Sequence, residues 1–140
     1  MKELKINHYA VWVAIALQFV IGFLWYGPLF GNAWMNATGL DMATIKADPA
    51  GAEEWITNII SAIISMYALA LLFKKLKVES WLTGAWYGFL IGFSFVLLST
   101  MTSNMFGKMP YGLAWITAGF TTVVLMVGGV LLGAWKAYKG

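Results

Sequence analysis

Residues 81–104 read WLTGAWYGFLIGFSFVLLSTMTSN and contain no Asp, Glu, Lys or Arg. A helix rises about 1.5 Å per residue, so a helix of this length crosses the apolar core of a bilayer, which is about 30 Å thick. Because the bilayer core offers no hydrogen-bond partner to an open peptide group, helix is the backbone expected for such a segment. This stretch therefore predicts a membrane-spanning helix.

Three further stretches without charge have a comparable length. Together with the first they predict four spans, at about 7–26, 55–73, 81–104 and 111–135, and a larger loop at about 31–54. Hydrophobic residues make up 61% of the 140 residues and charged residues only 11%, whereas soluble domains carry about 25% charged residues. The predicted fold class is all-α: a four-helix integral membrane bundle that forms one domain.

Helix ends are marked by residues with known preferences. Asn7 is a candidate N-cap for the first span, since its side chain can accept from free backbone N–H groups. Gly27-Pro28 is expected to end that span. In the loop, Gly39 and Asp41 are cap candidates for one or two short interfacial helices.

The lysines predict the orientation of the bundle. Lysines occur before the first span, between the second and third, and after the fourth, whereas only Lys46 and Lys108 lie on the opposite side. Cytoplasmic loops carry an excess of basic residues. We therefore expect a multi-pass protein of a cell membrane of the bacterial inner-membrane type, with both termini in the cytoplasm.

Composition excludes several classes of function. The chain has no cysteine and one histidine, which argues against disulfide scaffolds, zinc fingers and iron–sulfur clusters. All nine basic residues are lysines, so the bidentate contacts that arginine makes with nucleic acid are missing. Ion and proton pathways usually need a charged residue inside a span. Here no charged residue lies inside any span. We expect no cofactor, no metal site and no nucleic-acid partner.

The segment FLWYGPLFGNAWM, residues 23–35, resembles a signature of small bacterial membrane proteins grouped as domain of unknown function 1761. The resemblance extends over essentially the whole chain, from an Asn-aromatic start to a short hairpin between the third and fourth spans. It implies a similar size and helix number. The family has no established activity, so the resemblance assigns no catalytic or binding residue.

Glycines recur at helical spacing in the last two spans. Such strips let another helix approach closely in a bilayer, either within one bundle or between subunits, and both interpretations stay open here. The third span carries Gly84, Gly88 and Gly92, and the fourth carries Gly128, Gly129 and Gly133.

Polar residues inside the spans form a second pattern. Asn58, Ser61 and Ser65 recur at intervals of three and four and so share a helix face. The hypothesis is a polar cleft, open to the outside, that binds a small neutral solute. In the alternative, these side chains bond their own helices and the glutamine bridges two helices. The candidate residues are Gln18, Asn58, Ser61, Ser65, Ser99 and Thr121.

Three functions are compatible with these patterns. The first is a non-enzymatic bundle that forms a homo-oligomer in the lipid bilayer through its glycine faces. The second is a pore or facilitator for a small neutral solute that uses the polar cleft. The third is an enzyme acting on lipid, which would need residues such as His8, Asn104 or Glu53 to converge. The patterns identify no catalytic residue.

Overall fold

The computed structural model of the chain describes residues 3–139. Two short strands and seven α-helices follow one another, with two helical segments of the wider π type between them. In order these are β1 (Glu3–Lys5), α1 (His8–Leu24), η1 (Trp25–Leu29), α2 (Gly31–Thr38), α3 (Met42–Ala47), α4 (Ala52–Leu76), α5 (Trp81–Ile91), η2 (Gly92–Leu97), α6 (Leu98–Phe106), α7 (Tyr111–Ala134) and β2 (Ala137–Lys139).

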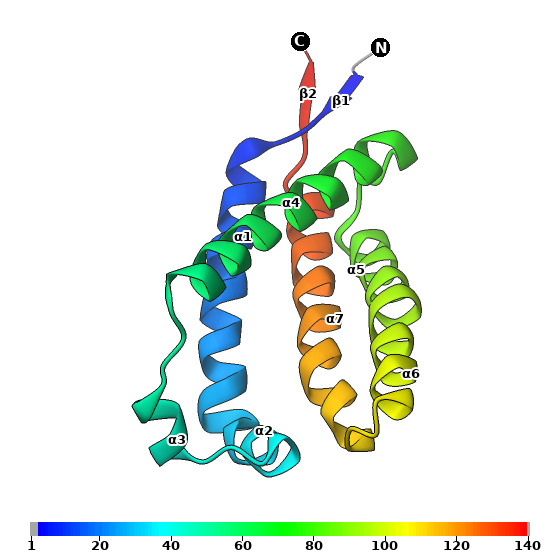
Figure 1. The fold of residues 1–140 in the computed structure, drawn as a ribbon. Helices are drawn as coiled ribbons and strands as arrows, with labels where there is room; N and C mark the ends of the chain where they lie inside the picture. The colour runs from blue at the N-terminus through cyan, green and yellow to red at the C-terminus, as the bar shows by residue number, and fades with distance from the viewer. Residues whose placement is uncertain (1–2, 140) are drawn as a thin grey trace.

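Four continuous helices are long and apolar enough to cross a membrane: His8–Leu29, Ala52–Leu76, Trp81–Phe106 and Tyr111–Ala134. They confirm the predicted four-helix membrane bundle. In Figure 1, α7 lies between α1 and the continuous α5–α6 helix, while α4 lies across them. Both chain ends lie at one end of the bundle, called here the terminal end, and α2 and α3 lie at the other, the loop end.

The glycines of α5 and η2 face α7 of the same chain. A Cβ atom at Gly84 would lie 2.7 Å from the carbonyl carbon of Gly129, and one at Gly88 would lie 2.6 Å from that of Leu125. At Gly92 it would lie 2.6 Å from the Cα atom of Thr122. These glycines therefore permit backbone-to-backbone packing of two helices within one chain.

The glycines of α7 complete this packing. A Cβ atom at Gly129 would collide with the carbonyl oxygen of Gly84, and one at Gly133 with that of Ser80. Gly128 faces α4 instead, where a Cβ atom would lie 2.7 Å from the sulfur of Met66. Both predicted strips thus contact helices of their own chain.

The first helix does not end at Gly27-Pro28, and that prediction is wrong. It continues as the π-helical segment η1, which includes Pro28. A proline has no N–H, and in an α-helix its ring clashes with the carbonyl four residues earlier. The wider turn keeps the chain helical: the Phe30 N–H donates to the carbonyl oxygen of Trp25, five residues back, at 2.8 Å.

The chain ends pair with each other at the terminal end. Strands β1 and β2 are antiparallel, with Leu4 opposite Tyr138, a pairing that no sequence pattern predicted. The Asn7 side chain caps α1, as predicted, by accepting from the N–H groups of Tyr9 and Ala10. Its Nδ2 also donates to the carbonyl oxygen of Trp135 at 3.0 Å. The start of α1 is thereby tied to the end of α7.

The loop contains two short helices, and both predicted caps are present. Gly39 ends α2 in the left-handed conformation, with φ of 76°. Asp41 begins α3, and its Oδ1 accepts from the N–H and from the hydroxyl of Thr44, both at 2.7 Å. These bonds, the hydroxyl bond first, lower the pKa of Asp41 below its ordinary value of 3.8.

The Asp41 cap predicts a pH dependence of α3. Since the folded-state pKa is lowered, the cap is complete above pH 3.8 and is lost as the pH falls through the folded-state pKa. The Thr44 amide chemical shift, followed by NMR, should titrate with a midpoint below 3.8. Thr44→Val removes the hydroxyl bond and should move this midpoint upward. A midpoint at or above 3.8 in the unmodified chain contradicts the cap.

Candidate functional site

A cavity of about 840 Å³ lies between α1, η1, α4 and α7. This volume lies in the range of pockets that hold small molecules, about 300–1,000 Å³. Its lining residues come mainly from α1 and η1, with two from α4 and one from α7. They are Gln18, Phe19, Gly22, Phe23, Tyr26, Gly27, Pro28, Trp55, Asn58 and Phe120.

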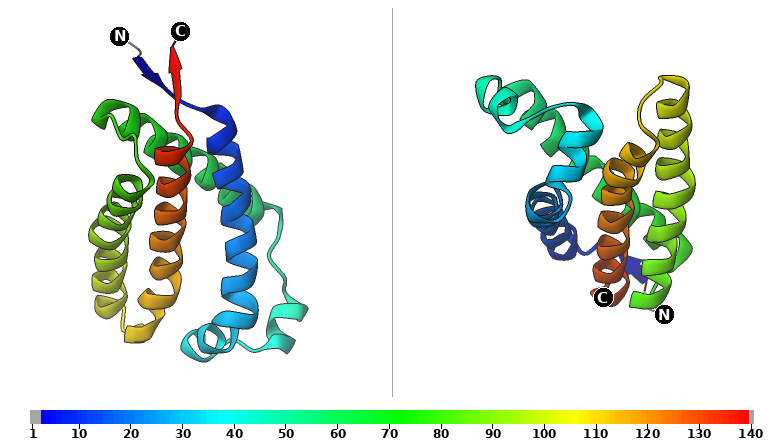
Figure 2. Two further views of the ribbon diagram at one scale, coloured as in Figure 1. Left: turned by 180° about the vertical axis from the view of Figure 1, so that it is seen from behind. Right: turned by 90° about the horizontal axis from the view of Figure 1, so that it is seen from below.

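The cavity forms because α4 approaches α1 closely only along part of its length. Small side chains make the close contact: Ala10 and Ala62 are fully buried, and Ala14 is nearly so. The first ten residues of α4, 52–61, are all exposed. In Figures 1 and 2 α4 lies obliquely across the other helices, so that its first turns extend away from them. The cavity occupies the space left beside these turns.

Aromatic residues make up half of the cavity lining. The ring of Phe120, from α7, lies 5.5 Å from the ring of Tyr26 and 6.2 Å from that of Trp25. It also contacts the backbone of α1, because a Cβ atom at Gly22 would lie 3.3 Å from its Cζ atom. The indole N–H of Trp25 donates to the carbonyl oxygen of Ile116 at 2.9 Å. These contacts join η1 to α7, and Tyr26 and Phe120 form part of the cavity wall.

Two residues with amide side chains, Gln18 and Asn58, also line this wall. The Oε1 atom of Gln18 is buried and has no hydrogen-bond partner among residues 3–139. Leaving a buried acceptor unpaired costs about 1–3 kcal/mol. Because less than 1 Å² of this oxygen is accessible, it does not face the open space of the cavity.

The other predicted cleft residues lie on three different helices, α4, α6 and α7. Asn58 also borders a neighbouring hollow of about 570 Å³ that includes Ser61. The Ser65 hydroxyl donates to the carbonyl oxygen of Ala62 in its own helix at 3.2 Å. Ser99 is exposed on α6, and Thr121 is half-buried on α7. The structure brings Gln18 and Asn58 to one cavity and does not bring Ser99 there.

The aromatic part of the site was not predicted from the sequence, in which Tyr26, Trp55 and Phe120 were assigned to no candidate site. One signal was available: Gln18, Gly22 and Tyr26 are spaced by four, so they lie on one face of a helix. A polar, a small and an aromatic residue on one face are compatible with a hollow beside that helix.

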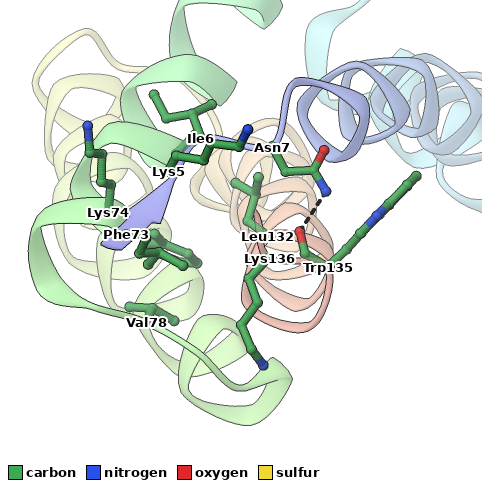
Figure 3. Close-up of a pocket in the computed structure, with 11 residues that line it drawn as sticks. Lys5, Ile6, Asn7, Phe73, Lys74, Val78, Leu132, Trp135 and Lys136 are labelled. Atoms are coloured by element: carbon green, nitrogen blue, oxygen red, sulfur yellow. Dashed lines mark hydrogen bonds between the residues drawn. The ribbon is translucent and has the colours of Figure 1, made fainter. Parts of the chain in front are cut away.

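The small hollow at the terminal end, drawn in Figure 3, is too small for a ligand. Its volume of about 20 Å³ fits one water molecule. The dashed line in Figure 3 is the bond from Asn7 to Trp135, and the ammonium groups of Lys5, Lys74 and Lys136 lie apart around the rim. Lys136 donates to the carbonyl oxygen of Glu79 at 2.7 Å. This region holds the chain ends together.

The residues that an enzyme site would need lie apart. His8 is at the terminal end, where its Nδ1 lies 2.9 Å from the Tyr67 hydroxyl. Asn104 is in the last turns of α6, at the loop end (Figure 1), and Glu53 begins α4. Within residues 3–139, no three His, Asp or Glu side chains come close enough to hold a metal ion.

The four apolar helices define a multi-pass membrane protein, and a cavity open to the molecular surface lies between three of them. The chain belongs to the family described as protein of unknown function (DUF1761), whose model matches residues 9–133. No curated protein and no solved structure matches it.

Proposed function

We propose that this protein binds a small, uncharged and mostly apolar molecule in the cavity between α1 and α4. The observation that carries the proposal is the cavity itself: about 840 Å³, lined by five aromatic residues and by two residues with amide side chains, Gln18 and Asn58. Binding sites for small molecules typically combine apolar walls with a few placed polar groups. The lining has no charged side chain, so the buried part of the ligand is uncharged.

The packing on one side of Gln18 favours binding over an open pore. This is the side that the lysines predict to be cytoplasmic. There the helices are joined by fully buried side chains, among them Val11 and Met66. A facilitator for a neutral solute would have to separate these contacts to let the solute pass. Its flux would not depend on a proton gradient, because the amide of Gln18 does not titrate.

A variant that fills the cavity tests the proposal. A Cβ atom at Gly27 meets nothing within 4 Å, so Gly27→Trp should place an indole in the cavity with little strain. We expect saturable binding of 1-pyrenemethanol to nanodiscs containing the protein, measured by energy transfer from tryptophan. In Gly27→Trp this binding should weaken by about tenfold or more, equal to about 1.4 kcal/mol.

Gly112→Trp is the matched control. Gly112 also has open space around its Cβ position but lies in the first turn of α7, away from the cavity lining. It adds the same indole and should leave binding unchanged. Equal weakening in both variants, or no saturable binding above that of empty nanodiscs, contradicts the proposal.

Self-association is a second proposal, and it requires a surface other than the predicted glycine faces. The glycine faces contact helices of the same chain, so a homo-oligomer in the bilayer would have to use an exposed surface. The first turns of α4, residues 52–61, offer such a surface, because every residue there is exposed. Its polar residues Asn58 and Ser61 could bond across a subunit boundary, as such residues do between membrane helices.

A further inference from the structure

We infer that the terminal end of the bundle is an interaction surface for anionic phospholipids, whose negatively charged headgroups its lysines bind. This inference does not depend on the cavity between α1 and α4. Three features carry it: the excess of positive charge at this end, the exposed rings beside the lysines, and the exposed leucines at the end of α4.

The first feature is charge. The described segments at the terminal end, residues 3–7, 74–80 and 135–139, together contain six lysines and two glutamates (Figure 1). The segments on the other side of the bundle, 31–54 and 107–110, contain two lysines and four carboxylates. Anionic headgroups attract lysines that lie close to the membrane surface. The terminal end therefore has the charge that complements an anionic leaflet, and the other side does not.

The lysines are distributed around the terminal end rather than gathered at one point. Lys5, Lys74 and Lys136 surround the small hollow of Figure 3, and their ammonium groups lie apart around its rim. Lys75 and Lys77 are exposed where α4 ends. One small anion cannot contact all of these groups, whereas a layer of headgroups can. The partner that fits them is therefore a lipid surface.

The second feature is a pair of tryptophans that adjoin lysines in the chain. Trp81 is four residues from Lys77, and Trp135 directly precedes Lys136. The side chains of both tryptophans are exposed. Such amphipathic rings take positions at the headgroup level of a membrane. With the rings at this level, the neighbouring lysines lie beside the phosphates of the lipids.

The third feature is the mixture of side chains at the end of α4. Leu72 and Leu76 are exposed on either side of Lys75 in the sequence. A lysine can keep its methylene groups in an apolar layer while its ammonium group extends to the interface. A lipid surface offers both the apolar layer and the negative charge, whereas a nucleic acid offers the charge alone. The mixture therefore favours lipid over a soluble polyanion.

Native mass spectrometry of the protein in a mild detergent tests the inference, because it counts bound lipid molecules. The probes are dioleoyl phosphatidylglycerol, which is anionic, and dioleoyl phosphatidylcholine, which has the same chains and no net charge. We expect the anionic lipid to bind about tenfold or more tightly at an ionic strength of about 0.1 M. This preference should fall at about 0.5 M, because salt screens exposed charges.

Replacing Lys5 and Lys75 together by glutamine should weaken binding of the anionic lipid by about tenfold or more, because each lost charge costs about fivefold. Both side chains are exposed, so the variant should retain the fold. Its binding of phosphatidylcholine should stay the same. The matched control is Lys46→Gln with Lys108→Gln, which removes the same charge from the other side of the bundle. This control should leave both affinities unchanged.

Several outcomes would overturn the inference. Equal affinity for the two lipids in the unmodified chain is one, and equal weakening in the two pairs of variants is another, because net charge alone would then explain binding. Inorganic phosphate or polyuridylic acid at matched ionic strength should not displace the anionic lipid. Displacement by either one would replace the lipid surface by a free anion or a nucleic acid. If the glutamine pair does not fold, the unmodified chain decides, since a preference that does not fall with salt contradicts binding by exposed lysines.

Discussion

Replacing Gly88 by alanine should lower the free energy of unfolding by about 3 kcal/mol, at the upper end of the usual cost of overpacking. The added Cβ atom would lie 2.6 Å from the carbonyl carbon of Leu125 and 2.9 Å from the Cα atom of Met126. Both are backbone atoms, so no side chain can rotate to make room, and α5 must move away from α7. The measurement is reversible unfolding in mixed micelles of mild detergent and dodecyl sulfate.

Gly112→Ala is the control for this prediction. A Cβ atom at Gly112 meets nothing within 4 Å, and alanine favours helix over glycine by up to about 1 kcal/mol. The control should therefore be neutral or slightly stabilising. An equal effect of the two substitutions contradicts the close contact. If Gly88→Ala instead separates an oligomer into folded subunits, the glycine strip lies between subunits.

Replacing Trp25 by alanine should cost about 3 kcal/mol, the lower end of the range for removing a large aromatic side chain. Its ring centroid lies 4.6 Å from that of Phe30, and its N–H donates to the carbonyl oxygen of Ile116. The alanine variant loses both contacts, and the ring of Phe120 loses a neighbour as well. Unfolding in the same mixed micelles measures the effect.

Trp25→Phe separates the two contributions. It retains a ring beside Phe30 and Phe120 but removes the indole N–H, so the Ile116 carbonyl loses this donor. Its cost should be about 1 kcal/mol, the net value of one hydrogen bond. A phenylalanine variant as unstable as the alanine variant would show that the ring itself contributes nothing.

The four helices could be predicted because their physical cause is local. A charged residue inside a span is costly in lipid, so the intervals between charges mark the helices directly. The caps at Asn7, Gly39 and Asp41 were predictable for the same reason, since each acts on backbone groups within three or four residues. Pro28 does not end the helix, because a wider turn can accommodate a proline. The formation of this turn depends on the packing of η1 against α7.

The β1–β2 pairing could not be predicted from local patterns. Each strand has three residues, too few for a recognisable alternation. The two strands lie at opposite ends of the sequence. They meet only because an even number of spans returns the chain to the same side. The strand pair is therefore a consequence of the bundle.

The polar half of the cavity was easier to predict than the aromatic half. Gln18 and Asn58 are conspicuous in apolar spans, because amides are rare in lipid-facing positions. Tyr26 and Trp55 were not conspicuous, since aromatic residues near span ends are ordinary at a membrane interface. What distinguishes them is the oblique course of α4, and the crossing of two helices is set by packing across the whole bundle.

The pairing of Leu4 with Tyr138 places the two extremities of the chain side by side. The polypeptide therefore runs in a nearly closed circuit. A short peptide joining the extremities and an opening cut between α2 and α3 would give a permuted chain in which every helix keeps its neighbours. We therefore expect the permuted chain to fold into the same bundle although its helices are synthesised in a different order.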